Sequence, residues 1–257
     1  MAKLSVCVEM IFREVGFLDR LPKVREAGFD AFEFWGTSGK DLAEIRCRQQ
    51  DSGLAVSALC AEHGPSLVAA GSAVRQEFLD GVRRALEACD RLDCRTVIVT
   101  VGNEDTSRPR AEQHANVVAH LAAAAPLAEK AGRALVLEPL NLLVDHKGYY
   151  LATTAEGVEM INEVGHPAVK LLYDIYHQQI TEGNLIATLR DHIGRIGHFH
   201  SADVPGRHEF GTGEINYANV LAEIDKLGYR GYVGLEFGPT AGSAEALARC
   251  RRIAGLG

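Results

Sequence analysis

Short hydrophobic runs alternate with longer amphipathic segments along the whole chain. Several of these runs are apolar at nearly every position, as expected for parallel strands that are covered on both faces. Their lengths suit strands better than helices. We therefore predict eight strands, over residues 4–10, 31–35, 55–61, 96–101, 134–140, 169–175, 196–202 and 232–237.

The segments between these runs repeat hydrophobic residues with the period of an α-helix. Within residues 74–92, spacings of three and four residues separate Phe78, Val82, Leu86 and Cys89. Such spacing places side chains on one helical face, which can then be buried. Similar patterns occupy residues 112–131, 155–164, 185–193, 217–227 and 243–253. Glycines stand where helices should end, at positions 28, 53, 132, 165 and 228. We therefore predict that a helix follows each strand.

Eight strand–helix units of about thirty residues each have the size and rhythm of a TIM barrel. No Pro/Ser-rich linker, charge run or change in composition divides the chain. We therefore predict an α/β fold with a single (β/α)8 TIM-barrel domain over residues 1–257. A doubly wound open sheet is the alternative, and the count of eight units favours the closed barrel. In a TIM barrel the active site lies at the C-terminal ends of the strands, so polar residues there become the candidates for function.

The charge balance narrows the range of expected partners. The 257 residues include 27 Lys and Arg against 34 Asp and Glu, which gives a formal net charge of -7. Proteins that bind nucleic acid usually present a basic surface. We therefore expect a small-molecule substrate and no nucleic-acid partner.

Cysteine usage and the absence of long apolar runs indicate the cellular setting. The six cysteines form no C-x-x-C pair, and a chain of this length folds without disulfides, so we expect reduced thiols. The N-terminal residues lack a signal-peptide pattern, and apolar runs such as residues 96–101 are too short to span a bilayer. We therefore predict a cytoplasmic protein with no membrane partner. The oligomeric state stays open, a homo-oligomer included.

Each of the last four predicted strands carries a polar residue at or near its C-terminal end. These residues are Glu138, Asp174, His200 and Glu236. Taken singly, a Glu there is explained by a salt bridge at the rim and a His by a satisfied core side chain. Burying a carboxylate beside leucines is unfavourable, however, unless it is paired or bound to a cation. Because neighbouring strands of a closed barrel bring the four together, we predict one divalent ion between them. Mg²⁺ or Mn²⁺ suits this oxygen-rich set best, and Co²⁺ or Zn²⁺ is also compatible.

Two further histidines lie close to this predicted site. His177 is three residues beyond Asp174, just past the strand, where it can face a substrate instead of the metal. His198 and His200 alternate along one strand, so both project to the same side. His200, nearer the C-terminal rim, is the better candidate ligand. His198 is then predicted to lie inward of it, either directly behind the metal ligands or in a core layer.

A long polar loop over residues 203–216 follows the seventh predicted strand. Loops of this composition over a barrel mouth are often functional. Arg207 within the loop is able to clamp a substrate carboxylate with two hydrogen bonds, and a solvent-exposed arginine is the equal alternative. Weaker candidates for the pocket are Glu9, Phe34, Trp35, His63, Asn141, Tyr149 and Tyr150, of which we retain His63 and Asn141 as substrate-binding residues.

The motifs around these residues resemble those of a known family. Glu-Pro-Leu-Asn at 138–141 and Leu-Tyr-Asp-Ile-Tyr-His at 172–177 are similar to motifs of the hydroxypyruvate isomerase family. That family belongs to the xylose isomerase-like TIM barrels, together with ketose 3-epimerases and endonuclease IV. Similar segments lie at 145–151, 202–209, 211–217 and 231–236. The resemblance is dense over the last half of the chain and rests on the strand–helix rhythm in the first half.

This resemblance implies a reaction and a role for each residue. It implies one divalent metal ion, held by Glu138, Asp174, His200 and Glu236. It also implies that Glu138 and Glu236 act as acid and base, while His177 and Arg207 hold the substrate. The implied activity is the isomerisation of hydroxypyruvate to tartronate semialdehyde (2-hydroxy-3-oxopropanoate) through an enediolate.

The chain departs from the family pattern at several positions. His200 stands where hydroxypyruvate isomerases carry Gln, as in the epimerases, and Lys147 and Phe210 stand where proline is common. Residues 60–64 differ from the Asn-Leu-Pro type of loop in the family. A ketose 3-epimerase or another sugar or sugar-acid isomerase of the superfamily is therefore the alternative, and a sugar-binding barrel without catalysis is the more distant one. The net charge of -7 argues against a nuclease.

Overall fold

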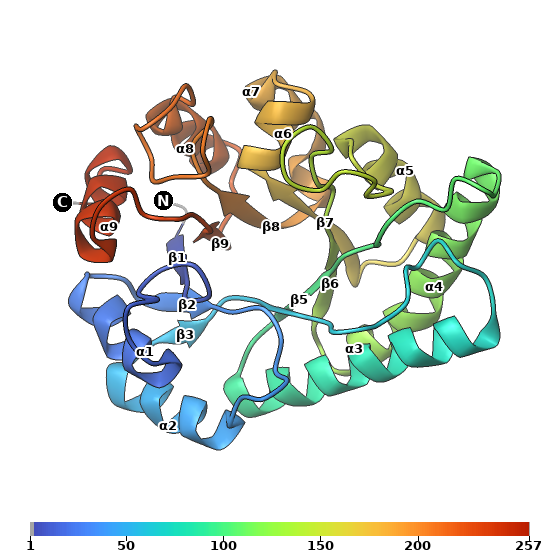
Figure 1. Cartoon of the computed structure of the whole chain (residues 1–257), viewed down its shortest axis with the longest axis horizontal. Helices are drawn as coiled ribbons and strands as arrows, with labels where there is room; N and C mark the ends of the chain where they lie inside the picture. Colours follow the sequence, from blue (N-terminus) through green and yellow to red (C-terminus); the bar gives the residue numbers. More distant parts are fainter. Residues whose placement is uncertain (1–2, 257) are drawn as a thin grey trace.

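Parallel strands curl into a nearly closed barrel with helices on the outside (Figure 1). The computed structural model describes residues 3–256. Neighbouring strands follow the order β3-β2-β1-β9-β8-β7-β6-β5-β4, so the last strand of the chain pairs with the first. The strands are β1 (Lys3–Cys7), β2 (Ala31–Glu33), β3 (Ala55–Val56), β4 (Leu59–Cys60), β5 (Thr96–Val99), β6 (Ala134–Leu137), β7 (Val169–Asp174), β8 (Ile196–Ser201) and β9 (Tyr232–Leu235). The predicted TIM-barrel fold is confirmed.

The helices surround the barrel in sequence order, and the colours of Figure 1 run once around the ring. They are α1 (Phe17–Glu26), α2 (Leu42–Ser52), α3 (Ser72–Leu92), α4 (Arg110–Lys130), α5 (Thr154–Val164), α6 (Ile175–Thr181), α7 (Leu185–His192), the 3₁₀ turn η1 (Ile193–Arg195), α8 (Tyr217–Lys226) and α9 (Ser243–Ile253). The six helices for which the pattern gave bounds agree with the structure to within two residues at each end. No helix within residues 3–256 has the length and apolar character needed to cross a membrane.

The predicted strand over residues 55–61 is divided into two short pieces. β3 pairs with β2, whereas β4 pairs with β5, so the chain changes neighbours between them. The backbone N–H of Ser57 donates to Phe32 O at 2.9 Å, and its hydroxyl also lies within hydrogen-bond distance of that oxygen. The prediction of one continuous strand is therefore wrong in this detail. The two pieces together fill the eighth position of the barrel.

Two apolar regions support the barrel. The larger one lies between strands and helices, where Phe78 and Val82 of α3 are buried as their spacing predicts. The smaller one consists of Ala58, between β3 and β4, and of Ile98, Val136 and Leu172 on the adjacent strands β5, β6 and β7. Leu172 is the register partner of His198, so this small cluster and the histidines of β8 share one side of the sheet. Apolar side chains thus fill the barrel interior next to the polar residues.

Candidate active site

The four residues predicted from the strand ends lie at the C-terminal ends of four consecutive strands. Glu138 directly follows β6, Asp174 is the last residue of β7, His200 is near the end of β8, and Glu236 directly follows β9. All four side chains are buried. Asp174 and His200 are register partners in adjacent strands. The closure of the barrel therefore brings these residues to one place.

Three of the four offer ligand atoms within 4.8 Å of one another, namely Glu138, Asp174 and His200. His200 Nδ1 lies 3.2 Å from Glu138 Oε1. Asp174 uses Oδ1 to accept the backbone N–H of Tyr176 at 2.8 Å and so caps α6, which leaves Oδ2 directed elsewhere. Two carboxylates and one imidazole nitrogen therefore converge on a single point.

The charges around this point favour a cation. Burial raises the pKa of Asp174 to about 6, and the nearby Glu236 acts in the same direction, although Arg207 and His200 oppose it. Burial alone would lower the pKa of His200, but Glu236 and Glu33 raise it well above its ordinary value. Crowded carboxylates are stabilised by added positive charge. The converging oxygen and nitrogen donors therefore fit a divalent cation of the Mg²⁺ or Mn²⁺ type.

Glu236, the fourth predicted ligand, lies at the edge of the group. Its Oε2 atom is 3.6 Å from His200 Nδ1 and pairs with the guanidinium of Arg207. Trp35 Nε1 donates a hydrogen bond of 2.8 Å to Oε1. Burial acts to raise the pKa of Glu236, but His200 and Arg207 outweigh it and leave the pKa below its ordinary value. The carboxylate is therefore ionised at neutral pH and able to accept a proton.

His177 and Asn141, both predicted to bind substrate, are in direct contact. The side-chain amide of Asn141 lies 2.6 Å from His177 Nδ1, and the backbone N–H of Asn141 donates to the same atom at 3.3 Å. His177 Nδ1 is thus an acceptor, and the proton of the neutral ring is on Nε2. Burial, reinforced by Arg207, lowers the pKa of His177 to about 4. Among the described residues Nε2 has no hydrogen-bond partner and lies 3.5 Å from Asp174 Oδ2, so a buried N–H donor faces the candidate site.

The loop of residues 203–216, between β8 and α8, presents Arg207. The carboxylate of Asp203 accepts backbone N–H groups from Val204, Gly211, Gly213 and Ile215. One buried side chain thereby ties both halves of the loop together. A Cβ at position 213 would overlap the carbonyl of Val204, so this position requires glycine. The guanidinium of Arg207 lies 5.3 Å from the ring centroid of Tyr176, beside Glu236.

Other predicted pocket residues are engaged within the protein. His63 has both ring nitrogens 3.0 Å from backbone carbonyl oxygens, those of Pro65 and Thr100. Glu9 pairs with Lys40 at 2.9 Å. The hydroxyl of Tyr149 donates to the carbonyl of Glu138 at 3.0 Å and so holds the backbone at the end of β6. Because both of its ring nitrogens contact backbone carbonyls, His63 has no free ring nitrogen to offer a substrate, contrary to the prediction that it binds one.

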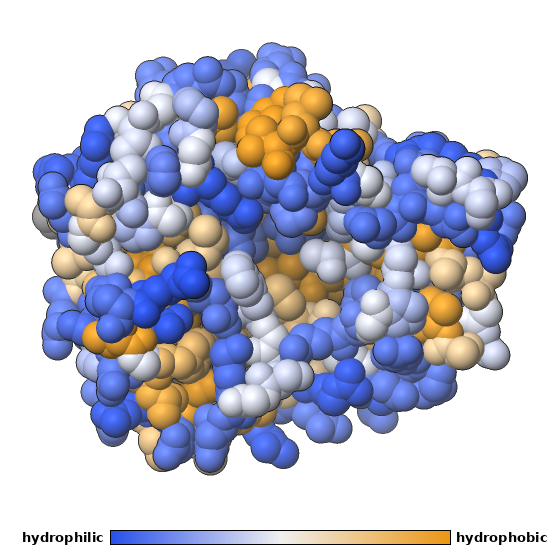
Figure 2. Space-filling view, in the orientation of Figure 1, coloured by the Kyte–Doolittle hydropathy of each residue, from blue (hydrophilic) through white to orange (hydrophobic). Residues whose placement is uncertain are grey.

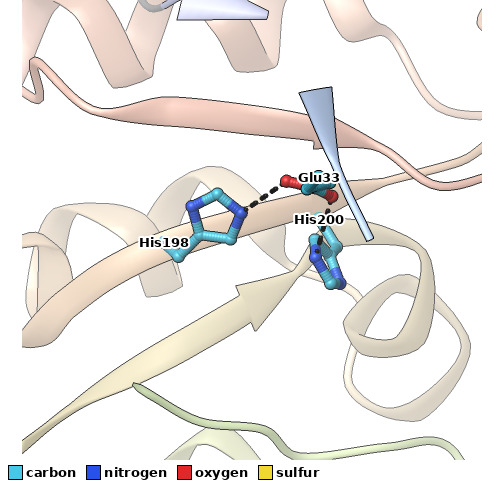
Figure 3. Close-up of side chains that lie close together, drawn as sticks. All are labelled: Glu33, His198 and His200. Carbon is cyan, nitrogen blue, oxygen red and sulfur yellow. Dashed lines mark hydrogen bonds and ion pairs between the residues drawn. The ribbon is translucent and has the colours of Figure 1, made fainter. Parts of the chain in front are cut away.

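Glu33 is a buried residue of the site region that the sequence reasoning missed. It ends β2, and its carboxylate contacts the ring nitrogens of His198 and His200 (Figure 3). The signal was present in the sequence, because Ala31-Phe32-Glu33-Phe34 places a carboxylate inside an apolar run. A carboxylate buried in an apolar run needs a partner, and this holds for Glu33 as it does for Glu138.

The face seen in Figure 2 is hollowed near its centre, and a raised hydrophobic patch borders the hollow. A cavity of about 740 Å³ lies beside the end of β9; its lining residues are Met10, Arg13, Glu14, Gly238, Pro239, Ala241, Gly242 and Ser243. Two concavities lie at the opposite end of the strands. The one of about 600 Å³ is beside Thr96 and Ala134, which begin β5 and β6, and the one of about 530 Å³ is beside Val169, which begins β7. None of the four strand-end residues lines any of these three cavities.

The chain matches known proteins over nearly its whole length. A model of the family described as xylose isomerase-like TIM barrel matches residues 21–253. The 2-oxo-tetronate isomerase of Cupriavidus necator is 33% identical over 252 residues, which cover 96% of this chain and 96% of the relative. The hydroxypyruvate isomerase of Escherichia coli is 32% identical over 247 residues, which cover 93% of this chain and 94% of the relative.

A solved structure agrees with the fold as a whole. The crystal structure of AP endonuclease, family 2, from Brucella melitensis superimposes with a TM-score of 0.92 at 29% identity. The superposition covers 97% of this chain and 98% of that one. With the strand-end residues in place and isomerases among the relatives, the chain belongs to the xylose isomerase-like TIM barrel family and is an isomerase similar to the hydroxypyruvate isomerases.

Proposed function

We propose that the protein isomerises hydroxypyruvate to 2-hydroxy-3-oxopropanoate through an enediolate. The observation that carries the proposal is the convergence of two buried glutamates on one imidazole nitrogen. Glu138 and Glu236 lie 3.2 and 3.6 Å from His200 Nδ1. Isomerisation needs two proton transfers at adjacent carbons, and two carboxylates close together suit that task. The named hydroxypyruvate isomerase among the relatives supports this substrate.

Glu138, Asp174, His200 and Glu236 would hold one divalent cation, with Mg²⁺ or Mn²⁺ the best suited. When bound, the cation supplies Lewis-acid stabilisation of the negative charge that develops on the substrate oxygens. Asp174 and His200 serve in this arrangement as ligands only. Glu138 and Glu236 each have two carboxylate oxygens, so ligation leaves the second oxygen of each able to exchange a proton.

The isomerisation moves two protons within the substrate and gains or loses none overall. Hydroxypyruvate loses one proton from carbon C3 and one from the C3 hydroxyl, while C2 and the C2 oxygen each gain one. One glutamate removes the proton from C3, and the other delivers a proton to C2; in the reverse direction the two exchange roles. Arg207 binds the substrate carboxylate through its guanidinium, whose buried Nε has no partner among the described residues. His177 donates its Nε2–H to a substrate oxygen.

The two glutamates provide the central test. We expect Glu138→Gln and Glu236→Gln each to lower kcat at least about a hundredfold, because each removes one proton-transfer group. The fold should persist, since glutamine has nearly the same shape. Turnover is measured with hydroxypyruvate and Mn²⁺. The matched control is Glu223→Gln, which removes a carboxylate from α8 that pairs with Arg190, and it should keep normal turnover.

Isotope uptake in D₂O separates the alternatives. Label at C2 of the product supports the isomerase, whereas label returned to the original carbon of a ketose would establish a 3-epimerase.

The four-carbon 2-oxo-tetronate is the second candidate substrate, because the relative from Cupriavidus necator carries that name at 33% identity. Near-normal turnover in both Gln variants would contradict the assigned roles. Full activity after exhaustive chelation would exclude the metal.

A further inference from the structure

Glu33 forms a second layer of polar contacts next to the candidate metal ligands (Figure 3). Its Oε2 atom lies 3.0 Å from His198 Nε2 and accepts a hydrogen bond of 2.9 Å from the Ser57 hydroxyl. Its Oε1 atom lies 3.1 Å from His200 Nε2. Glu33, His198 and His200 are all nearly inaccessible to solvent. A carboxylate this deeply buried requires several partners, and the barrel supplies them from separate strands.

The space for this carboxylate is built into the barrel. Gly234 of β9 is the register partner of both Ser5 and His200, and a Cβ at position 234 would overlap the Glu33 carboxylate. Ser5 in turn contacts the Ser57 hydroxyl at 2.5 Å. Glu33 thus occupies the space left by the glycine on β9 and is surrounded by two serine hydroxyls and two imidazoles. Such a cradle, contributed by β1, β8, β9 and the turn between β3 and β4, specifies one orientation of the carboxylate.

The two nitrogens of His200 face different groups. Nε2 faces Glu33, whereas Nδ1 faces Glu138 and Glu236. A histidine ligates a metal through one unprotonated nitrogen, and the partner of the other nitrogen decides which one that is. A carboxylate on Nε2 favours a proton there and leaves the lone pair of Nδ1 for the cation.

We propose that Glu33 is a positioning residue that holds His200 through Nε2–H and presents Nδ1 to the divalent cation. The inference rests on the proposed function, because it concerns the same cation. Glu33 acts through His200 and does not touch the substrate. His198 and Ser57 support Glu33 by occupying its other oxygen.

Glu33, His198 and His200 also form a group able to hold an ion of their own. The contacts argue against this use. Glu33 Oε2 already accepts from Ser57 and lies at hydrogen-bond distance from His198. Glu33 Oε1 forms an ion pair of 3.1 Å with His200 Nε2, and neither atom has a hydrogen-bond partner among the described residues. We therefore expect one bound ion per chain.

The test measures metal binding directly. Glu33→Gln should weaken Mn²⁺ binding by about 10- to 100-fold in calorimetric titration of the full-length protein, the usual effect of losing the carboxylate behind a ligating histidine. In ¹⁵N NMR of the imidazoles with Mg²⁺ bound, His200 should lose its single Nε2–H tautomer. Ser57→Ala removes only one hydrogen-bond donor to Glu33 and should weaken Mn²⁺ binding less than Glu33→Gln does. If Glu33→Gln fails to fold, the Mn²⁺ affinity of Ser57→Ala tests the proposal instead. Glu223→Gln should bind Mn²⁺ like the wild type.

The outcomes separate this inference from the proposed reaction. Unchanged Mn²⁺ affinity and an unchanged His200 tautomer in Glu33→Gln would overturn the positioning role, whatever the enzyme turns over. A second equivalent of Mn²⁺ that is lost in Glu33→Gln would overturn it too, in favour of a separate metal site. If Glu33→Gln binds Mn²⁺ more weakly but the wild type turns over no short 2-oxo acid, the positioning role is supported and only the proposed reaction is contradicted.

Discussion

At the scale of single residues, Asp174 joins two parts of the site. One oxygen caps α6 through the N–H groups of Tyr176 and His177, and the other lies 3.5 Å from His177 Nε2. The cap fixes where α6 begins and therefore where His177 stands. Asn141 completes the arrangement from the opposite nitrogen. The candidate metal ligand and the candidate substrate donor are thus positioned by the same few contacts.

His177 should leave a signature in the pH dependence of stability. Burial lowers its pKa from 6.5 to about 4, so the folded protein binds fewer protons than the unfolded chain between these values. The stability due to the neutral ring is complete above pH 6.5 and is lost as the pH falls through about 4. In chelator, the wild type should lose about 2 kcal/mol more than His177→Gln between pH 7 and pH 5. Urea unfolding measures this difference, and parallel curves would contradict it.

At the scale of elements, the loop between β8 and α8 depends on one buried carboxylate. The four backbone N–H groups that Asp203 accepts come from both halves of the loop. The other face of the loop is held by Glu209, which accepts the backbone N–H of Thr240 at 3.0 Å. Arg207 lies between these two attachments. These hydrogen bonds hold the loop in the position in which the guanidinium of Arg207 lies beside Glu236.

Gly213→Ala tests this support. A methyl group there would collide with the Val204 carbonyl and displace the loop, so kcat/KM should fall at least about tenfold, equivalent to about 1.4 kcal/mol. The barrel should stay folded, because the change adds one methyl group in a loop and leaves the strands and helices unaltered. Gly194→Ala adds the same methyl group where nothing lies within 4 Å, and it should have normal kcat/KM. Equal kinetics in the two variants would argue against the role of the loop.

At the scale of the whole molecule, the candidate site collects side chains from β2, β6, β7, β8 and β9. No single strand contributes more than two of these side chains. The site therefore forms only when the barrel closes and brings the strand ends together. A cation bound there contacts several strands at once and stabilises the folded form over the unfolded chain.

Metal removal should therefore lower thermal stability. At a hundred times the dissociation constant, a bound ion adds about 2.7 kcal/mol, which raises Tm by roughly 5–10 °C for a chain of this length. Differential scanning calorimetry with Mn²⁺ and with EDTA measures the change. His200→Ala should abolish the response to Mn²⁺, while Glu223→Gln should retain it. An identical Tm with Mn²⁺ and EDTA would count against a bound ion.

The barrel and its four strand-end residues were predictable because each signal is local. A run of apolar residues ending in Glu138 or Asp174 is visible within a few positions of sequence. Glu33 was missed because its partners, His198 and His200, come from across the barrel on β8 and lie far from it in the sequence. The division of residues 55–61 was equally hidden, because it reflects a change of pairing partner from β2 to β5. Contacts between distant strands carry information that one strand alone does not contain.

The hydrogen bonds of Asp203 have a consequence for protein engineering. Residues 205–210 lie between the backbone donors and are not among them. Libraries restricted to this stretch, with Arg207, Glu209 and the buried Phe210 retained, can vary the surroundings of Arg207 while the hydrogen bonds of Asp203 and Glu209 persist. Preference for a three-carbon or a longer acid can then be selected without redesigning the scaffold beneath.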